Sequence, residues 1–298
     1  MKRTPIFRGT GTALVTPFTA KGSVDEPALR RLVDFQIKGG VEALLPTGTT
    51  GESVTLSEDE QERVVGIVVS QTRGRIPVIA GAGSNSTEKA IALARRVMAA
   101  GADGVLSVAP YYNKPTQEGF FRHYEALAAA VDAPIIVYNV PGRTASNVEA
   151  RTTLRMAREI PSICGIKEAS GNFGQMMEIL RERPKGFAVW SGDDAIALPL
   201  AALGADGVVS VVSNEVPKTF SMMMRLSLQG KFDQAVRLHN LLLPLMNFNF
   251  VESNPIPVKA ALAMMGLIKE HYRLPMVPLS RPHRPALKRI LKELGLVT

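Results

Sequence analysis

Short apolar runs alternate with amphipathic segments along most of the chain. At three junctions an amphipathic run ends in glycine and leads directly into a β-branched or apolar stretch, at residues 38–45, 100–106 and 203–209. Glycine is common just past the end of a helix because it adopts positive φ without steric cost. The repeated pattern therefore predicts helices that connect directly to buried strands.

This alternation predicts eight strands separated by helices. Three strands follow the glycine junctions, and the other five are expected at residues 12–16, 78–80, 135–139, 163–167 and 188–191. The helices are expected at residues 27–37, 57–72, 87–99, 116–130, 147–160, 173–183 and 195–202. Ser57 and Glu60 have the spacing of a capping box at the start of the second helix. Eight strands in alternation with helices favour a (β/α)8 TIM barrel.

A doubly wound sheet that binds a nucleotide is the alternative fold. Its first turn would carry three glycines, followed by an acidic residue further along the chain. The glycine pairs at residues 9–11 and 81–83 lack the third glycine and the acidic partner. The barrel is therefore the favoured architecture.

Residues beyond Val212 no longer alternate and instead resemble helices interrupted by prolines. We expect the barrel, with the active site, to occupy residues 1–230 and a C-terminal helical domain to occupy residues 231–298. The chain is 46% hydrophobic and 21% charged, an ordinary globular composition. No apolar stretch approaches the roughly 18–20 residues that span a bilayer, and the start lacks an apolar signal core. We therefore expect a cytoplasmic protein without membrane contact.

The formal net charge of +8 could indicate a nucleic-acid partner. The basic residues are scattered in pairs along the expected helices, however, and no basic run is interleaved with aromatic residues. We expect no nucleic-acid partner, and a positive field that favours small anionic substrates. The single cysteine, Cys164, excludes an intrachain disulfide. The four histidines lack ligand spacing, so no metal site is expected.

Lys167 ends the expected strand at residues 163–167, where an apolar run should continue. Burying an ammonium group costs several kcal/mol unless the group is paired or loses its proton. A neutral lysine is a nucleophile that forms Schiff bases with carbonyl substrates. The alternative is a lysine just beyond the strand end that forms a surface ion pair with Glu168 or another carboxylate.

Strand alternation predicts which side chains of this segment face the barrel axis. If Lys167 faces the axis, then Gly165 and Ile163 face it too. Cys164 and Ile166 are then expected to face the surrounding helices.

Polar side chains follow several of the expected strands, at the end where barrels carry their chemistry. They lie at residues 47–52, 110–113, 138–143, 167 and 191–194. Taken singly, each has an ordinary explanation: a plain turn at residues 48–51, rim packing by Tyr111 and Tyr112, a surface ion pair of Arg143, and helix capping by Asp193 and Asp194. Their shared placement favours a lysine that reacts with a carbonyl substrate.

Five motifs together resemble the dihydrodipicolinate synthase family, a group of class I pyruvate-dependent aldolases and lyases. The motifs lie at residues 48–52, 110–115, 138–144, 165–169 and 254–259, and the resemblance covers essentially the whole chain. Members of this family are (β/α)8 barrels with a helical C-terminal domain. The resemblance implies condensation of pyruvate with L-aspartate β-semialdehyde, on the way to diaminopimelate and lysine, by a homotetramer built as a dimer of dimers.

The resemblance also implies four catalytic residues. Lys167 matches the lysine that forms the imine with pyruvate, so no separate cofactor is implied. Tyr138 matches the proton shuttle beside it. Thr49 and Tyr112 match the rest of a hydroxyl relay, in which the tyrosine comes from a neighbouring subunit.

Four further positions match substrate-binding residues of the family. Thr50 corresponds to the hydroxyl that holds the pyruvate carboxylate, and Arg143 to the guanidinium that receives the semialdehyde carboxylate. Gly192 and Val209 correspond to positions where the main chain lines the site.

A sister activity on the same barrel is the main alternative, for example N-acetylneuraminate lyase or another 2-oxo acid aldolase or dehydratase. Those relatives share the lysine, the tyrosine and the loop at residues 48–52. Arg143 favours the synthase, because the sugar-acid lyases generally lack it. A non-catalytic ligand sensor is disfavoured because the whole relay is present.

Many family members bind lysine at a subunit interface, which here corresponds to Ser53, Asn85 and Tyr111. This chain carries Glu58, Gln61 and Lys89 where lysine-sensitive relatives tend to have two histidines and a glutamate. Lys89 would oppose a cationic effector. We therefore expect weak inhibition by lysine, or none.

Overall fold

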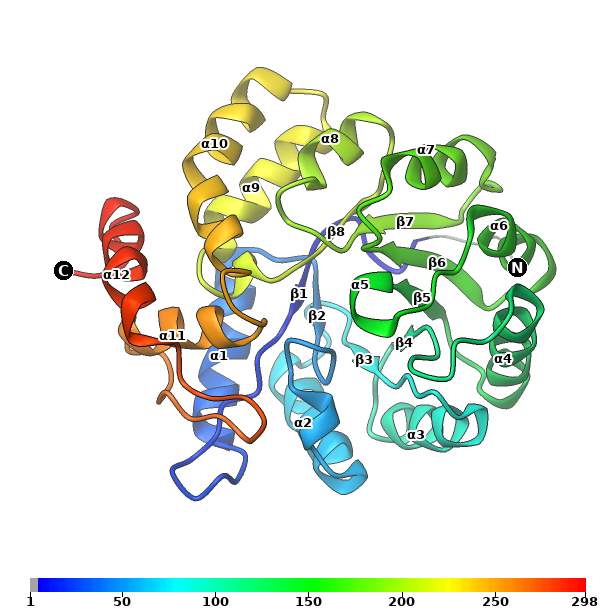
Figure 1. The fold of residues 1–298 in the computed structure, drawn as a ribbon, viewed down its shortest axis with the longest axis horizontal. Helices are drawn as coiled ribbons and strands as arrows, with labels where there is room; N and C mark the ends of the chain where they lie inside the picture. The colour runs from blue at the N-terminus through cyan, green and yellow to red at the C-terminus, as the bar shows by residue number, and fades with distance from the viewer. Residues whose placement is uncertain (1–4) are drawn as a thin grey trace.

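Eight parallel strands form a nearly closed barrel in the computed structural model, which describes residues 5–298 (Figure 1). The strands are β1 (Gly9–Ala13), β2 (Ala43–Leu45), β3 (Ile79–Gly81), β4 (Gly104–Val108), β5 (Ile135–Asn139), β6 (Ile163–Glu168), β7 (Ala188–Ser191) and β8 (Gly207–Ser210). They are ordered β2-β1-β8-β7-β6-β5-β4-β3, and a parallel bridge between Leu44 and Val78 joins the two ends of this order. The predicted (β/α)8 barrel is confirmed.

Helices cover the outside of the barrel between successive strands (Figure 1). They are α1 (Glu26–Gly39), α2 (Glu58–Thr72), α3 (Thr87–Ala99), α4 (Gln117–Ala130), α6 (Ala150–Glu159), α7 (Phe173–Glu182), α8 (Ala197–Ala202) and α9 (Pro217–Leu228). The predicted capping box starts α2, with Ser57 Oγ accepting from the Glu60 amide at 3.2 Å and Glu60 Oε2 accepting from the Ser57 amide at 3.0 Å. A short helix that the sequence pattern did not predict, α5 (Pro141–Thr144), lies over the strand ends (Figure 1).

The first strand starts and ends earlier than predicted. It spans Gly9–Ala13 rather than residues 12–16, and Gly9 pairs with Gly207 of β8. Leu14 and Val15 follow the strand and are buried among side chains of α1 and α2. The apolar run therefore continues past the point where the strand pairing stops, which is why hydrophobicity alone misplaced the boundary.

The barrel interior is filled by apolar side chains from alternate positions of the strands. The Phe7 ring stacks on Trp190, with centroids 4.8 Å apart and ring planes 18° apart. A second cluster lies between the strands and α3, α4 and α6, and it includes Val105, Tyr124 and Ile166. Both faces of the sheet are thus buried, as is usual for parallel sheets.

Two of the predicted side-chain directions in β6 are wrong. Cys164 packs inside the barrel and Ile163 packs on the helix side. The register between β5 and β6 shifts at this point, because Ile135 pairs with Ile163 whereas Ile136 pairs with Gly165. A bulge of this kind inverts the alternation on one side of it. Beyond the bulge the prediction holds.

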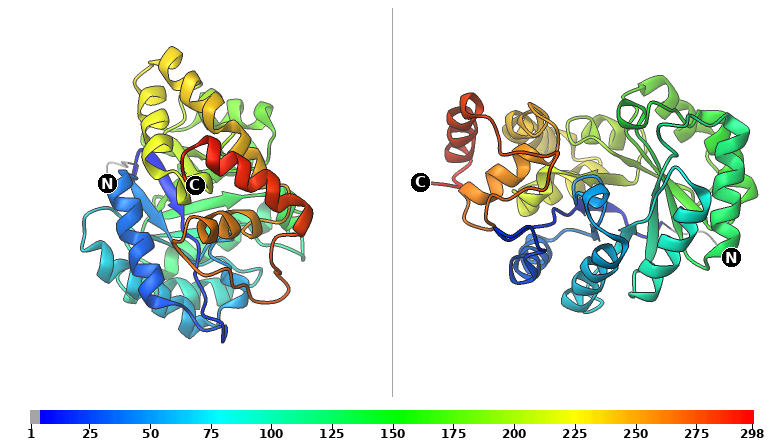
Figure 2. Two further views of the ribbon diagram at one scale, coloured as in Figure 1. Left: turned by 90° about the vertical axis from the view of Figure 1, so that its left-hand side faces the viewer. Right: turned by 60° about the horizontal axis from the view of Figure 1, so that its bottom comes forward.

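The C-terminal extension lies to one side of the barrel, next to α1 and α9 (Figures 1 and 2). Its helices are α10 (Phe232–Phe248), α11 (Ile256–Met264) and α12 (Arg284–Glu293). α10 packs against α9, and their shared apolar cluster includes Phe220, Leu242 and Leu245. The domain boundary at residue 230 stays a prediction. Within residues 5–298, no helix is both long enough and apolar enough to cross a membrane.

Candidate active site

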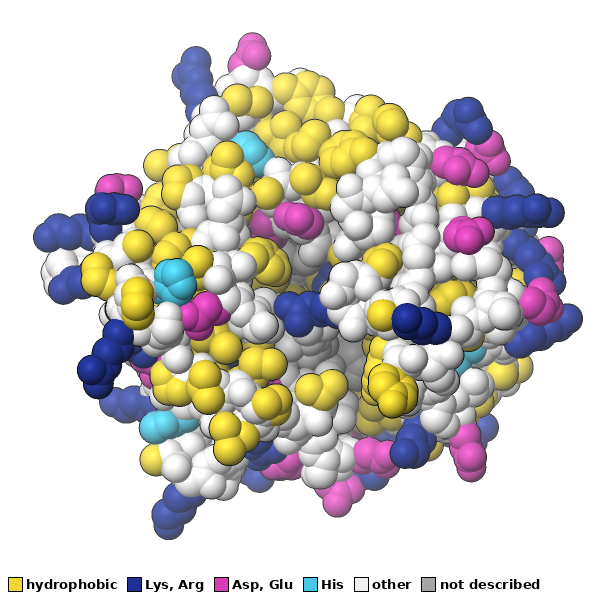
Figure 3. Space-filling view, in the orientation of Figure 1, with side chains coloured by type: hydrophobic (Ala, Val, Ile, Leu, Met, Phe, Trp, Pro, Cys, Tyr) yellow, Lys and Arg dark blue, Asp and Glu magenta, His cyan; other side chains and the backbone are white. Residues whose placement is uncertain are grey.

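A small cavity lies at the carboxyl ends of the strands. Its volume is about 140 Å³, and its lining includes six residues predicted from the sequence, namely Thr49, Thr50, Tyr138, Arg143, Lys167 and Gly192. The space-filling view shows a hollow near the centre of the face on which α5 lies, with a basic side chain at its edge (Figure 3). These six residues therefore lie together at the strand ends as predicted, whereas the lining of this cavity includes no residue of the segment 110–113.

Lys167 lies inside the barrel, and its side chain reaches the cavity. It is 6% exposed, and its Nζ atom lies 4.0 Å from the centroid of the Tyr138 ring. The parallel pairing of β5 and β6 places these two residues directly opposite each other. Both side chains therefore approach the cavity from neighbouring strands.

The alternative role of Lys167, an ion pair with Glu168, is wrong. The Glu168 carboxylate is fully buried on the helix side, where it accepts hydrogen bonds from Asn139 Nδ2, Gln175 Nε2 and the Ser170 amide at 2.7–3.3 Å. None of the ion pairs among residues 5–298 includes Lys167. The amine is therefore available to a ligand in the cavity.

Gly192 allows the main chain after β7 to approach Lys167 closely. A Cβ atom at this position would lie 3.1 Å from Cε of Lys167 and 2.5 Å from Cβ of Ala169. The Gly192 amide also donates to the Glu168 carbonyl at 2.8 Å. A side chain here would crowd the lysine, so the position requires glycine.

The loop after β2 brings two hydroxyl groups to the cavity. Thr50 Oγ1 accepts a hydrogen bond from Asn254 Nδ2 at 3.0 Å, and both side chains are buried. Because this bond uses Thr50 as an acceptor, its hydroxyl hydrogen remains free to donate to a ligand. Asn254 also lines the cavity. The sequence analysis did not assign Asn254 to the site, although it belongs to the motif at residues 254–259.

Arg143 extends from α5 and lines the small cavity together with a larger adjoining one of about 580 Å³. The two cavities also share Thr49, Tyr138, Val140 and Asn254. In the described part of the chain, Arg143 belongs to no ion pair. The alternative of a surface ion pair is therefore wrong, and the guanidinium is available to an anion.

Two predicted site residues do not line the small cavity. Tyr112 is 87% exposed and has a φ of 73°. Val209 is buried in the barrel interior, and Val211 lines the cavity instead. The expected role of Tyr112 in a neighbouring subunit stays a prediction.

The expectation of a helix cap is wrong for Asp194, whereas Asp193 accepts from the Ala195 amide at 2.9 Å in the turn that leads into the next helix. α8 begins at Ala197, and its cap position, Ile196, makes no side-chain hydrogen bond. Asp194 instead accepts from the Val211 and Val212 amides at 3.0 and 2.8 Å. Burial raises the pKa of Asp194 to about 6. This carboxyl group therefore holds the loop after β8 against the one after β7.

Metal-binding groups do not gather at the site. Across residues 5–298, no group of three or more His, Cys, Asp or Glu side chains is placed to hold a metal ion. Burial lowers the pKa of His123, the most deeply buried histidine, to about 4. This side chain pairs with Thr87 at 2.9 Å, away from the cavity.

The chain is similar to known proteins over nearly its whole length. It matches the Dihydrodipicolinate synthetase family over residues 6–294. It is 53% identical over 292 residues to the 4-hydroxy-tetrahydrodipicolinate synthase of Koribacter versatilis, with 98% of this chain and 97% of that protein covered.

Solved structures agree with this result. The dihydrodipicolinate synthase of Thermotoga maritima has a TM-score of 0.97 at 46% identity, with 98% of this chain and 100% of that chain covered. A chloride-inhibited dihydrodipicolinate synthase of Acinetobacter baumannii, complexed with pyruvate, has a TM-score of 0.95 at 44% identity, with 97% and 99% covered. The resemblance seen in the sequence is confirmed, and the chain belongs to the dihydrodipicolinate synthetase family.

Proposed function

We propose that this protein condenses pyruvate with L-aspartate β-semialdehyde to give 4-hydroxy-tetrahydrodipicolinate, through an imine on Lys167. The observation that carries the proposal is the buried Lys167 amine, which pairs with no carboxylate of residues 5–298 and faces a cavity beside Tyr138. The names of the relatives support the same activity, and one relative was crystallised with pyruvate.

The first half of the reaction activates pyruvate. The Lys167 amine attacks the C2 carbonyl, and the resulting carbinolamine loses water to form the imine. The imine nitrogen withdraws electrons from C3, so a C3 proton leaves and an enamine forms. We assign the proton transfer to Tyr138, because its ring centre lies 4.0 Å from Nζ. Its phenol moves protons without placing a second charge in the cavity.

The second half forms the new carbon–carbon bond. The enamine C3 attacks the aldehyde carbon of the semialdehyde, and the aldehyde oxygen takes a proton to become the 4-hydroxyl group. The semialdehyde amine then attacks C2 and displaces Lys167, which closes the ring and regenerates the free lysine. No redox partner is required, because the only small molecule released is water.

The cavity carries a donor for each substrate carboxylate. Asn254 donates to the Thr50 hydroxyl oxygen, so the Thr50 hydroxyl hydrogen remains free to bind a carboxylate. Arg143 lies where the two cavities meet and has the charge to receive the carboxylate of the semialdehyde. Thr49 also lines both cavities, and we assign it the next step of the proton relay after Tyr138.

We propose that a second copy of this chain supplies Tyr112, the third hydroxyl of the proton relay. Tyr112 is exposed on the rim in a left-handed backbone conformation, which non-glycine residues rarely adopt. A homotetramer arranged as a dimer of dimers would bury this side chain against the site of its neighbour. The expected mass in solution is therefore that of four chains.

Substrate selection tests the proposed activity. Purified protein is given pyruvate together with either L-aspartate β-semialdehyde or N-acetylmannosamine, and pyruvate consumption is followed. We expect consumption only with the semialdehyde. Consumption with N-acetylmannosamine would instead identify a sugar-acid aldolase, and imine formation without consumption in either mixture would identify a sensor.

A further inference from the structure

The loop that carries the two threonines is held from outside the barrel by the C-terminal extension. We call residues 47–57 the threonine loop. Lys259, on α11, places Nζ 2.5 Å from Oε1 of Glu52 in this loop, and the two side chains are 0% and 2% exposed. Lys259 also lies 4.4 Å from the centre of the Phe18 ring. A fully buried ion pair therefore links α11 to the loop.

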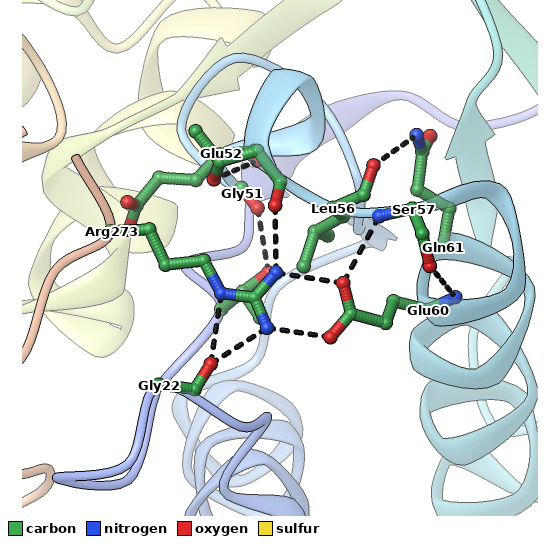
Figure 4. A network of polar contacts seen from close by, with 10 residues as sticks. Gly22, Gly51, Glu52, Leu56, Ser57, Glu60, Gln61 and Arg273 are labelled. Atoms are coloured by element: carbon green, nitrogen blue, oxygen red, sulfur yellow. Dashed lines mark hydrogen bonds and ion pairs between the residues drawn. The ribbon is translucent and has the colours of Figure 1, made fainter. Parts of the chain in front are cut away.

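Arg273, further along the extension, contacts the same loop from another direction. Its guanidinium lies between the Gly22 carbonyl and the Glu60 carboxylate (Figure 4). All five of its N–H groups are used: two donate to Gly22, two donate to Glu60 and one donates to the Thr55 carbonyl, at 2.5–2.8 Å. This degree of saturation fixes the position of the guanidinium.

The contacts continue within the threonine loop. Glu60 accepts from the Ser57 amide as well as from Arg273, so one carboxylate joins the loop end, α2 and the extension (Figure 4). Thr55 Oγ1 donates to the Glu52 carbonyl at 3.1 Å. Lys259 thus holds the middle of the threonine loop, and Arg273 holds its C-terminal end.

The threonine loop has a backbone that needs outside support. Thr47 and Glu52 both have a φ of 54°, a left-handed conformation that costs free energy in residues other than glycine. Such conformations persist when the surrounding contacts over-determine them. Thr49 and Thr50 lie between these two residues.

A buried ion pair is weak evidence for stabilisation, because desolvation of both charges offsets their attraction. Burial lowers the pKa of Lys259, and Glu52 acts against that shift. What the pair provides is a fixed direction and distance between α11 and the loop. The Lys259–Glu52 pair therefore serves to position the threonine loop rather than to raise the free energy of unfolding.

We propose that Lys259 and Arg273 are positioning residues, which hold the threonine loop so that the Thr49 and Thr50 hydroxyls face Lys167. This inference rests on the proposed function, because it concerns the hydroxyls that bind pyruvate there. Neither Lys259 nor Arg273 lines the small cavity, so both act through the loop.

The test compares three variants with the wild type. Arg273→Met removes one support, and the double variant Lys259→Met with Glu52→Gln removes the other without leaving a buried charge unpaired. Arg284→Met is the matched control, because Arg284 makes a similar two-point contact with Glu270 at 2.6 and 3.0 Å in the same extension but does not contact the loop. The pyruvate concentration that gives half-maximal borohydride-trapped adduct is measured alongside the thermal unfolding midpoint.

We expect Arg273→Met and the double variant to raise the half-saturating pyruvate concentration about tenfold or more, the scale of one lost charge-assisted contact. For Arg284→Met, the half-saturating pyruvate concentration should stay within about twofold of the wild-type value. Its unfolding midpoint should nevertheless fall as far as that of Arg273→Met. A double variant that folds and saturates like the wild type would overturn the inference.

If Arg273→Met fails to fold, Arg273→Lys takes its place, because a lysine keeps the charge but loses the five-donor geometry. We expect the same rise in half-saturation for this variant, and a wild-type value would overturn the inference. A wild type that forms no adduct refutes the proposed function and this inference together. If the wild type forms the adduct and both Arg273→Met and the double variant saturate at the wild-type pyruvate concentration, this inference alone is refuted.

Discussion

Lys167 and Tyr138 are direct partners in the pairing of β6 with β5, and the lysine Nζ atom lies 4.0 Å from the centre of the tyrosine ring. The pairing of two short buried strands holds the two side chains together, since each residue is the penultimate one of its strand. A nucleophile and a proton-transferring group are thereby held together on rigid elements. Rigid placement of this kind favours catalysis, because the reacting groups need not be ordered when the substrate binds.

Arg143→Ala should impair use of the semialdehyde far more than imine formation with pyruvate. One charge-assisted hydrogen bond to a carboxylate contributes about 1.5–3 kcal/mol. We therefore expect about a tenfold to hundredfold rise in KM for the semialdehyde, with adduct formation from pyruvate nearly unchanged. Arg289→Ala, an exposed charge change on α12, is the control. Unchanged kinetics for both substrates in Arg143→Ala would favour the aldolase alternative.

Gly192→Ala should slow adduct formation although it adds only a methyl group. That group would lie 3.1 Å from Cε of Lys167 and 2.5 Å from Cβ of Ala169, so the lysine or the loop must move. We expect a loss of at least about tenfold in the rate of trapping, since small misplacements of reacting groups are costly. Gly66→Ala, on α2 with open space around its Cβ position, should react at the wild-type rate. Equal rates for the two variants would show that Lys167 tolerates the crowding.

Free lysine should inhibit this enzyme weakly or not at all. The larger cavity is lined by Glu58, Gln61 and Lys89. Lys89 repels an ammonium group, and Glu58 pairs with Arg96 at 3.4 Å. Half-maximal inhibition should therefore need more than about a millimolar lysine, an affinity scale near 4 kcal/mol.

The variant Lys89→Glu tests this explanation. It replaces a repulsive charge with an attractive one, and we expect about a hundredfold gain in sensitivity to lysine. Inhibition of the wild type below a millimolar would show that Glu58 or another acid supplies the missing charge. Sensitivity that is equal in the wild type and Lys89→Glu would place the effector elsewhere.

The Arg273–Glu60 contact should make stability depend on pH on the acid side. Arg273 lowers the pKa of Glu60 from its ordinary value of 4.5 to about 2. The folded state then binds fewer protons than the unfolded state in this interval, so this contribution is complete above about pH 4.5 and disappears as the pH falls toward 2.

Urea unfolding of the wild type and Glu60→Gln measures this contribution. At pH 7 the wild type should be more stable by about 1–2 kcal/mol, the scale of a partly buried charged contact. The difference should shrink as the pH is lowered from 4.5 to 3. A constant difference over that range would mean that the Glu60 charge contributes nothing.

The sequence predicted the barrel and the lysine because both depend on local patterns. Glycines that follow the helices mark the helix ends, and Lys167 interrupts an apolar run. The bulge at Cys164 was not predictable, because it arises from the pairing of β6 with β5 rather than from either strand alone.

The contacts between residues far apart in the sequence could not be predicted either. Asn254 bonds to Thr50 across 204 positions, and Arg273 bonds to Glu60 across 213. Polar residues in a proline-rich extension give no local sign of their partners. Asp194 shows the same limit, because its position before a helix suggested a cap whereas the fold directs it to the β8 loop.

Trapping with pyruvate and borohydride, followed by mass analysis of the peptides, shows directly whether Lys167 forms the imine. Reduction makes the imine permanent, so the modified residue is read without assumptions about the second substrate. We predict one adduct, on the peptide that contains Lys167, and none in Lys167→Ala or in Lys167→Arg, whose guanidinium stays protonated and cannot attack a carbonyl. Absence of an adduct in the wild type, or an adduct on another lysine such as Lys259 in its place, would contradict the assignment of Lys167 as the residue that forms the imine.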